Sequence, residues 1–363
     1  MKNPCSLRLS ATTAWLISSC FLLAIACKGP EPPAPQPEDN LPPMVLCEEN
    51  FTPKGHPHQV IGFYPSYRET SLPLADLRWD HLSRIVYAFA LPRTNGTLDV
   101  GALGGADALI EAAHQEGVEV YLSIGGGGNS ENFPVMARDS AARKRFAREV
   151  QRYLGTHCFD GVDVDWESWT KDANNQPSQE ESESLVALLR DLKTELAPHQ
   201  MGITIDVFAS DWFGRHYLDE VVDLVDEVQI MAYDFSGSWS APGPHSSFEQ
   251  AIGTGSVKTG LKYWEETRGW SKEKLILGLP FYGRDFDNNG GGITYADILA
   301  LHPQAFTADQ VANIYFNGRA TIADKCEYIR DGSYPGVMIW ELGQDTRETQ
   351  TSLLTVVDSV LNP

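Results

Sequence analysis

A chain of 363 residues with 42% hydrophobic and 10% aromatic residues is long enough for one large α/β barrel or for two modest domains. Its formal charge of −21 argues against nucleic acid and polyanionic substrates as partners, because like charges repel. A neutral substrate is compatible with this charge, although the charge does not identify one.

The N-terminus predicts a targeting segment. Lys2 and Arg8 precede a short apolar run, which is short for a membrane span and resembles the apolar part of a signal peptide. The run ends in LLAIAC, which resembles a bacterial lipoprotein signal with Cys27 as the lipidated residue; Cys20 is a weaker candidate, and plain secretion is the alternative. We therefore expect a signal peptide over residues 1–26 and a cell-envelope lipoprotein, in the outer membrane or at the cell surface, or a secreted protein.

A tether is expected next. Residues 27–50 are rich in Pro and acidic residues, a composition that cannot bury a core. Such a segment would space a folded domain, residues 51–363, away from a membrane that it touches through its lipid anchor only.

Cysteine and histidine usage predicts neither disulfides nor metal. If Cys27 is lipidated, Cys47, Cys158 and Cys326 remain, an odd number, so we expect no disulfide framework. The sequence contains no CxxC motif or Cys/His cluster that would suggest zinc.

Short β-rich runs alternate with mostly helical stretches from residue 60 onward. The strands are expected at Val60–Tyr64, Arg84–Phe89, Glu119–Ile124, Gly161–Trp166, Gly202–Phe208, Glu227–Tyr233, Leu275–Pro280 and Gly336–Trp340. The clearest helices are expected at Ala106–Glu116, Ser140–Leu154, Glu180–Leu196 and Arg347–Leu361. This alternation predicts an α/β fold, a (β/α)8 TIM barrel. An open doubly wound sheet is the alternative, weakened by the absence of a strand–GxGxxG–helix unit.

The longest connection between expected strands is Phe281–Pro335. It contains a Gly-rich turn, a short helix at Tyr295–Leu301 and a possible strand pair around Ile314–Gly318. We see no room there for a separate domain. The sequence therefore predicts a single catalytic domain without a large insertion domain.

The stretch FDGVDVDWE is the most unusual part of the chain. Asp163, Asp165 and Glu167 alternate with the apolar Val164 and Trp166, so in a strand the three acids share one face. A row of acids facing inward cannot be ordinary core, because buried charges are costly unless paired, hydrogen-bonded or protonated. We interpret it as a file of coupled carboxylates that ends in one catalytic acid. A solvated edge strand is the alternative.

Other unusual residues follow the expected strands, at the end where a (β/α)8 barrel carries its active site. They are Ser123–Gly126, Glu167, Tyr233–Asp234, Phe281–Arg284 and Trp340–Glu341. Each has a structural reading, such as core packing or a turn, but their convergence predicts a joint site. The glycines lack the Lys-Ser/Thr of a phosphate loop, so we expect no nucleotide and no other cofactor.

Five motifs together resemble the family 18 glycoside hydrolases. FDGVDVDWE resembles the DxxDxDxE signature of that family, SIGG (Ser123–Gly126) its SxGG motif and MAYD (Met231–Asp234) its MxYD motif. LGLPFYGR (Leu277–Arg284) and GVMIWELGQD (Gly336–Asp345) resemble its last two barrel strands. The similarity runs from about Val60 to Leu361, and it is greatest to compact bacterial chitinases.

The resemblance implies hydrolysis assisted by the substrate itself. Glu167 would be the general acid, and the carbonyl oxygen of the N-acetyl group of the substrate would be the nucleophile, giving an oxazolinium intermediate and net retention. Asp165 would orient the acetamido N–H and share a proton with Asp163. Tyr233 would hydrogen-bond the acetamido oxygen.

The resemblance also implies a set of sugar-binding residues. They are Trp340 as an apolar floor, Asp234 and Arg284 as holders of the sugar or of the carboxylate network, Tyr64 and Phe89 in the same subsite, and Met231 and Gly126. Where many family members have Tyr or Phe after the catalytic acid, Ser168 and Trp169 follow here, so Trp169 either supplies an aromatic surface or lies on the protein surface.

We therefore expect a monomeric chitinase that hydrolyses β-1,4 bonds between N-acetylglucosamine units in chitin or its oligosaccharides. One alternative is an endo-β-N-acetylglucosaminidase acting on N-glycan cores. Another is a non-catalytic chitooligosaccharide-binding lipoprotein, which the presence of Glu167 argues against.

Overall fold

The computed structural model describes residues 52–363 except 173, 175, 251, 252 and 254. The expected signal peptide, the tether up to residue 50 and Cys27 lie outside the described residues. Within the described part, no helix is both long enough and apolar enough to cross a membrane.

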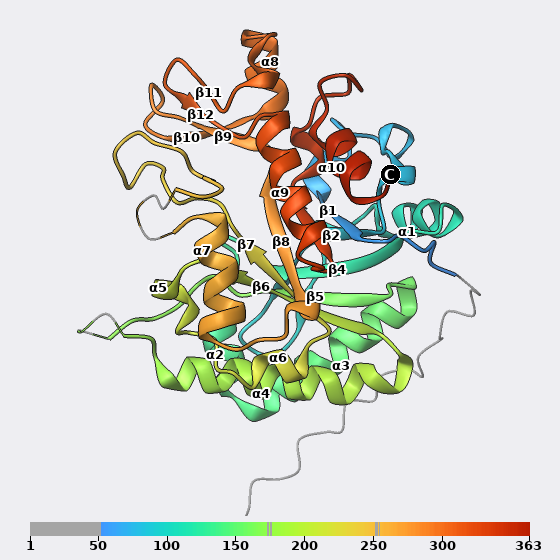
Figure 1. The fold of residues 1–363 in the computed structure, drawn as a ribbon. Coiled ribbons are helices and arrows are strands. Elements are labelled where there is room, and N and C mark those ends of the chain that lie inside the picture. Colours follow the sequence, from blue (N-terminus) through green and yellow to red (C-terminus); the bar gives the residue numbers. More distant parts are fainter. Residues whose placement is uncertain (1–51, 173, 175, 251–252, 254) are drawn as a thin grey trace, which may run out of the picture. The chain divides into compact units, whose positions relative to one another are not determined.

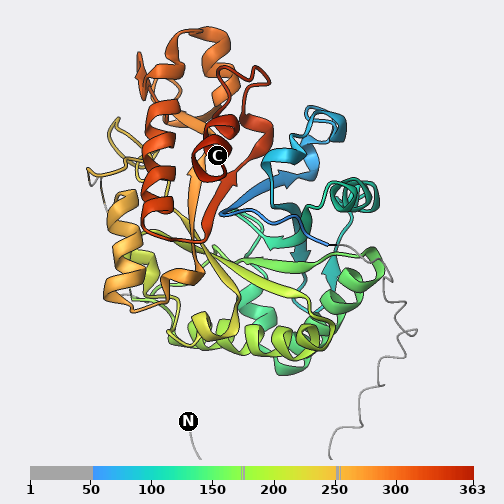
Figure 2. The ribbon, with the colours of Figure 1, turned by 45° about the vertical axis from the view of Figure 1, so that its right-hand side comes forward.

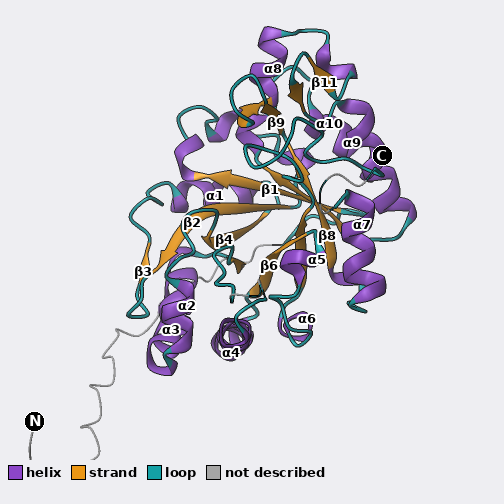
Figure 3. Ribbon diagram, turned by 90° about the vertical axis from the view of Figure 1, so that its left-hand side faces the viewer, coloured by secondary structure: helices purple, strands orange, loops and turns teal. Residues whose placement is uncertain are grey.

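A closed barrel of parallel strands lies at the centre of the described chain, and helices surround it (Figures 1 and 3). Around the barrel the strands are β1 (Gln59–Pro65), β2 (Arg84–Pro92), β4 (Glu119–Gly125), β5 (Gly161–Asp165), β6 (Gly202–Phe208), β7 (Glu227–Met231), β8 (Leu275–Pro280) and β13 (Gly336–Trp340). Pairing of β1 with both β2 and β13 closes the ring. The predicted (β/α)8 barrel is confirmed, and each expected strand is present within two residues of its expected ends except β2, which continues three residues further.

Helices connect the strands and follow the last one, and some of them begin at a residue whose side chain caps the first turn. The helices around the barrel are α1 (Ala106–Gln115), α2 (Phe133–Arg138), α3 (Ser140–His157), α4 (Gln179–Leu196), α5 (Asp211–Gly214), α6 (Val221–Leu224), α7 (Val257–Lys262), α9 (Arg319–Asp331) and α10 (Leu353–Leu361). Asp139 caps α3 and Ser178 caps α4 by accepting backbone N–H groups of the first turn. The expected start of the last helix at Arg347 is wrong, because Ser352 caps α10.

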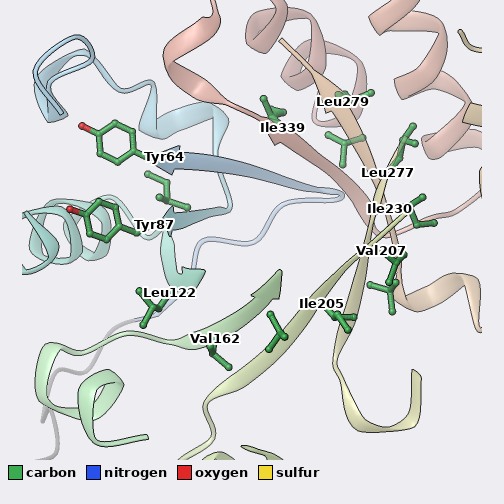
Figure 4. Packing of buried hydrophobic residues seen from close by; sticks show 14 of the residues in the cluster. Tyr64, Tyr87, Leu122, Val162, Ile205, Val207, Ile230, Leu277, Leu279 and Ile339 are labelled. Atoms are coloured by element: carbon green, nitrogen blue, oxygen red, sulfur yellow. The ribbon is translucent and has the colours of Figure 1, made fainter. Parts of the chain in front are cut away.

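The main core lies between the barrel and its helices. Figure 4 shows the side chains that alternate outward from the strands, among them Leu122, Val162, Ile205 and Ile230. A second, smaller cluster lies inside the barrel and includes Phe63 of β1. Both faces of most strands are therefore buried, as expected for parallel strands covered by helices.

The connection from β8 to β13 forms a small antiparallel sheet on the side of the barrel away from α3 and α4 (Figure 2, orange). In order across this sheet lie β10 (Gly291–Thr294), β9 (Tyr282–Asp285), β12 (Ile314–Tyr315) and β11 (Gln310–Val311), with α8 (Tyr295–Leu301) beside them. A short strand pair, β3 (Leu98–Asp99) with β2, extends the main sheet. Within this connection, helix α8 was predicted, and the strand pair of β11 and β12 was predicted only in part. Strands β9 and β10 were not predicted. Tyr295, Ile314 and Phe316 belong to the main core, so the segment packs as part of one domain.

One expectation about cysteine is wrong. Cys158, which follows α3, is disulfide-bonded. Cys326 on α9 is a buried free thiol. The odd number of cysteines left after Cys27 therefore did not exclude a disulfide.

Candidate active site

A cavity of about 320 Å³ lies at the C-terminal ends of the barrel strands. Its lining residues are Phe63, Tyr67, Phe89, Gly127, Asn129, Asp165, Glu167, Asp206, Met231, Tyr233, Asp234, Tyr282 and Trp340. The structure thus brings seven predicted site residues together: Phe89, Asp165, Glu167, Met231, Tyr233, Asp234 and Trp340. A larger hollow of about 980 Å³ lies near the opposite ends of the strands and contains none of these side chains.

The alternation predicted for β5 is present. Val164 and Trp166 belong to the outer core, whereas Asp163 and Asp165 are buried on the inner face. Trp166 stacks on Trp169 with ring centroids 5.0 Å apart. Trp169 therefore packs against the core beside the barrel and does not line the cavity.

Asp163 is fully buried and held by neutral donors. In the described part of the chain, Ser123 of β4 and Thr204 of β6 donate to it at 2.8 and 2.7 Å, and Gln229 of β7 donates at 2.8 Å. The strand register explains the first two contacts, because Ser123, Asp163 and Thr204 pair across three adjacent strands. Burial raises the pKa of Asp163, and these hydrogen bonds lower it only in part.

Asp165 and Glu167 form the inner and outer parts of a coupled carboxyl pair. Burial raises the pKa of Asp165 well above its ordinary value, and the charges of Glu167 and Asp163 raise it further. Burial and the charge of Asp234 raise the pKa of Glu167 to about 7, although a hydrogen bond with Asp165 opposes them. Glu167 can therefore hold a proton near neutral pH and release it to an oxygen in the cavity.

Backbone contacts fix the start of the segment after β5. The hydroxyl of Ser130 accepts the N–H groups of Glu167 and Ser168 at 3.1 and 3.0 Å. A Cβ atom at Gly127 would lie 3.3 Å from Oε1 of Glu167. The glycine run after β4 thus leaves room for the carboxyl group beside it.

Asp234 remains an anion on the other side of the cavity. Arg284 donates to its Oδ1 through Nε at 2.9 Å and Nη2 at 2.6 Å, and the Tyr282 hydroxyl donates to the same oxygen at 2.8 Å. His245 Nδ1 lies 3.5 Å from it. Burial alone would raise the pKa of Asp234, but the contact with His245 and the ion pair with Arg284 outweigh it and lower that pKa.

Aromatic rings form the apolar wall of the cavity. The ring of Trp340 lies 5.5 Å from that of Phe63 and 5.7 Å from that of Phe89. Next to this wall, a hollow of about 310 Å³ is lined by Trp340, Asp234 and Arg284, among others. Trp239 is 61% exposed, and the Arg284 guanidinium lies 5.2 Å from its ring. Flat apolar rings beside ionised and hydroxyl groups suit the faces and the edge of a sugar.

Three predicted sugar-binding residues do not line this cavity. Tyr64 is fully buried on the outer face of β1, where it stacks on Tyr87 and its hydroxyl donates to the Leu72 carbonyl at 2.7 Å (Figure 4). Gly126 lies behind the cavity: its N–H donates to the Asp165 carbonyl, and a Cβ atom there would lie 2.8 Å from the Phe89 ring. Arg284 lines the adjacent hollow and holds Asp234.

The structure adds residues that sequence reasoning missed. Phe63, not Tyr64, faces the cavity from β1, and Asp206 of β6 also lines it. Tyr282 of β9 lines it too and belongs to the run Phe281–Arg284 that was expected near the site. Asp206 carried a signal, because it is the single acid in the apolar run of Gly202–Phe208 and lies two residues from Thr204. His245 carried none that sequence alone could use.

Among the described residues, no group of three or more His, Cys, Asp or Glu side chains could hold a metal ion. The arrangement offers a carboxyl at the cavity, Glu167, that can be protonated near neutral pH, a fixed anion, tyrosine hydroxyls and an aromatic wall. Such a set can protonate a leaving oxygen while it stabilises positive charge nearby.

Comparisons with known proteins agree on one family. The sequence profile described as "Glycosyl hydrolases family 18" matches residues 59–345. A chitinase-like effector of Moniliophthora perniciosa is 28% identical over 304 residues, which cover 77% of this chain and 68% of that protein. The crystal structure of a chitinase from Bacteroides thetaiotaomicron is similar with a TM-score of 0.74 and 29% identity, covering 84% of this chain and 96% of that one. A GH18 chitinase from the chitin utilization locus of Flavobacterium johnsoniae has a TM-score of 0.72 and 28% identity, covering 85% and 94%.

Proposed function

The chain belongs to family 18 of the glycosyl hydrolases, and on this basis we propose that it is a chitinase that cleaves β-1,4 bonds between N-acetylglucosamine units. The observation that carries the proposal is the position of Glu167, whose pKa is raised to about 7, at the outer end of a buried carboxyl file and beside an aromatic wall. The two similar solved structures are chitinases by their titles.

In the proposed reaction Glu167 protonates the glycosidic oxygen and the sugar–oxygen bond breaks. Most glycosidases supply a second carboxylate as nucleophile or base. Here the inner acids, Asp163 and Asp165, are buried behind Glu167 and raised in pKa, so they suit proton sharing better than attack. The carbonyl oxygen of the N-acetyl group of the substrate attacks the anomeric carbon instead and forms the oxazolinium ion, which water then opens with retention.

The remaining residues orient this attack. Tyr233 lines the cavity, and burial raises the pKa of its hydroxyl well above the ordinary value, so it stays a neutral donor for the acetamido oxygen. Asp165 accepts the acetamido N–H once it turns toward the substrate. Trp340 lies under the reacting sugar. Holding the acetamido group close to the anomeric carbon lowers the entropic part of the barrier.

The test compares the wild type with Glu167→Gln on a fluorogenic chitobioside. We expect kcat to fall by between about 100-fold and 10,000-fold, because the amide cannot donate the proton. The matched control is Glu183→Gln, a change at an exposed glutamate on α4 that should keep full activity. Equal activity of the wild type and the Glu167 variant would refute Glu167 as the acid.

A binding role without catalysis is the second candidate, since one relative is described as a chitinase-like effector. A wild type that binds chitooligosaccharides in calorimetry but releases no product would establish that role. Release of intact glycans from a high-mannose glycoprotein, with no cleavage of chitooligosaccharides, would instead establish an endo-β-N-acetylglucosaminidase.

We also propose that the protein is anchored outside the cytoplasm through a lipid on Cys27. The support is the LLAIAC sequence, followed by a Pro-rich acidic stretch. The test is labelling with a radioactive fatty acid in a bacterial host. Label that persists in Cys27→Ser but disappears in Cys20→Ser would move the anchor to the other candidate, and no label in the wild type would favour secretion.

A further inference from the structure

Asp206 is a fourth carboxyl in the barrel interior. On β6 it follows Ile205, which pairs with Val164 of β5, and on the other side it pairs with Gln229 of β7. Its residue surface is 1% exposed, yet it lines the catalytic cavity. Neither of its carboxyl oxygens receives a hydrogen bond from a donor in the described part of the chain.

The nearest partner of Asp206 is another acid. The carboxyl groups of Asp206 and Asp163 lie within hydrogen-bonding reach of each other. Two carboxyl groups form a hydrogen bond only when one of them is protonated. Asp163 already accepts from Ser123, Thr204 and Gln229, which stabilises its ionised form. The proton between the two acids therefore belongs on Asp206.

The surroundings of Asp206 favour the same assignment. From β5 it faces Asp163 and Asp165, with Glu167 beyond them, and Tyr217 and Tyr233 are close enough to interact with its charge. Among the described ion pairs, none joins a Lys, Arg or His to these carboxyls on β5 or to Asp206. Burial raises the pKa of Asp206 well above its ordinary value, and the charges of Asp163 and Asp165 raise it further.

We propose that Asp206 is a positioning residue that stays protonated and donates a hydrogen bond to Asp163. The role in catalysis rests on the chitinase function proposed above. With Asp206 as a further donor, Asp163 is a poor proton acceptor, so the proton shared along β5 stays on Asp165. Asp165 is the acid that contacts Glu167, and the shared proton is then held next to the reacting groups.

Two variants separate this role from simple packing. Asp206→Asn keeps a neutral donor of nearly the same shape, whereas Asp206→Ala removes the donor. We expect Asp206→Ala to lower kcat on a chitobioside at least about tenfold more than Asp206→Asn does, since the loss of one hydrogen bond to a charged group commonly costs this much. The acid limb of the pH–activity profile should move to higher pH in the Ala variant, because Asp163 loses a hydrogen-bond donor and its pKa rises.

An opposite pH effect would overturn the proposal. If Asp206 were ionised in the working enzyme, Asp206→Asn would remove a negative charge near Glu167 and move the alkaline limb to lower pH by about one unit or more. If the Asn and Ala variants lost kcat equally and both limbs of the pH–activity profile stayed in place, a hydrogen-bonding role would also be rejected.

Thermal unfolding of the free protein tests the protonation without any substrate. A carboxyl whose pKa is raised by folding binds its proton more tightly in the folded state. The protein therefore loses stability as the pH rises above about 4, the pKa of an Asp carboxyl in the unfolded chain. We expect the unfolding midpoint of Asp206→Asn to rise relative to the wild type between pH 4 and pH 7. Parallel curves would refute the protonated state. A wild type without hydrolase activity but with diverging curves would reject the chitinase and keep the protonated Asp206.

Discussion

Replacing Asp234 by Asn should move the alkaline limb of the pH–activity profile to lower pH. The ionised Asp234 is the second cause, after burial, of the raised pKa of Glu167. A negative neighbour makes loss of a proton harder, so removing that charge lowers the pKa of Glu167. Because the proposed reaction needs the protonated acid, activity would then be lost at a lower pH.

The size of the shift follows from the surroundings of both groups. The pKa of Glu167 rises from 4.5 to about 7, and burial has the larger part of that rise. The charge of Asp234 supplies part of the remainder, and each pH unit of that part corresponds to about 1.4 kcal/mol. In the variant Arg284 would lose its carboxylate partner at 2.6 Å and stand as an uncompensated cation near the cavity. Its charge would add to the shift in the same direction.

The assay is the pH dependence of kcat/KM on a fluorogenic chitobioside, which reports the pKa of the acid in the free enzyme. The matched control is Asp191→Asn, since Asp191 of α4 forms a similar ion pair with Arg143 at 2.7 Å but lies outside the site. An alkaline limb that stays in place in Asp234→Asn, or that moves equally in the control, would refute this account of Glu167.

Two further substitutions test where the structure places the tyrosines. Tyr233→Phe should lower kcat by about 100-fold, the usual cost of one oriented donor, with an unchanged midpoint of thermal unfolding; a change in KM alone would assign the hydroxyl to ground-state binding. Tyr64→Phe should keep full activity but lower the free energy of unfolding in urea by about 1 kcal/mol, because the hydrogen bond to Leu72 is lost. Loss of activity in Tyr64→Phe at unchanged stability would return Tyr64 to the site.

The barrel could be predicted from sequence because its signals are local. Each strand is a short apolar run bounded by helices, and strand order in a (β/α)8 barrel follows chain order. The inner face of β5 was also readable, since its acids alternate with apolar residues. The same reasoning failed in β1, where GFY is buried on both sides. A run of apolar residues without alternation does not show which side chains face inward. Nothing in the sequence therefore distinguished Phe63, which faces the cavity, from Tyr64.

Contacts between distant segments were not predictable. His245 reaches Asp234 from a loop, and Arg284 and Tyr282 reach it from β9, a strand that the sequence did not predict. Their joint effect, a carboxylate kept ionised beside Glu167, depends on the folded loops after β7 and β8. The motif names Asp234, but only the structure shows what holds its charge.

The acids inside the barrel serve the proposed reaction and not the fold. Asp163, Asp165 and Asp206 occupy positions that apolar side chains could fill, and buried acids without cations are usually less stable than such a core. The barrel tolerates them in two ways. Asp163 accepts hydrogen bonds from neutral donors, whereas burial raises the pKa of Asp165 and Asp206, so these two can keep their protons. The same burial and the nearby charge that cost stability also keep Glu167 protonated near neutral pH. Apolar replacements that stabilise this cluster should therefore reduce catalysis.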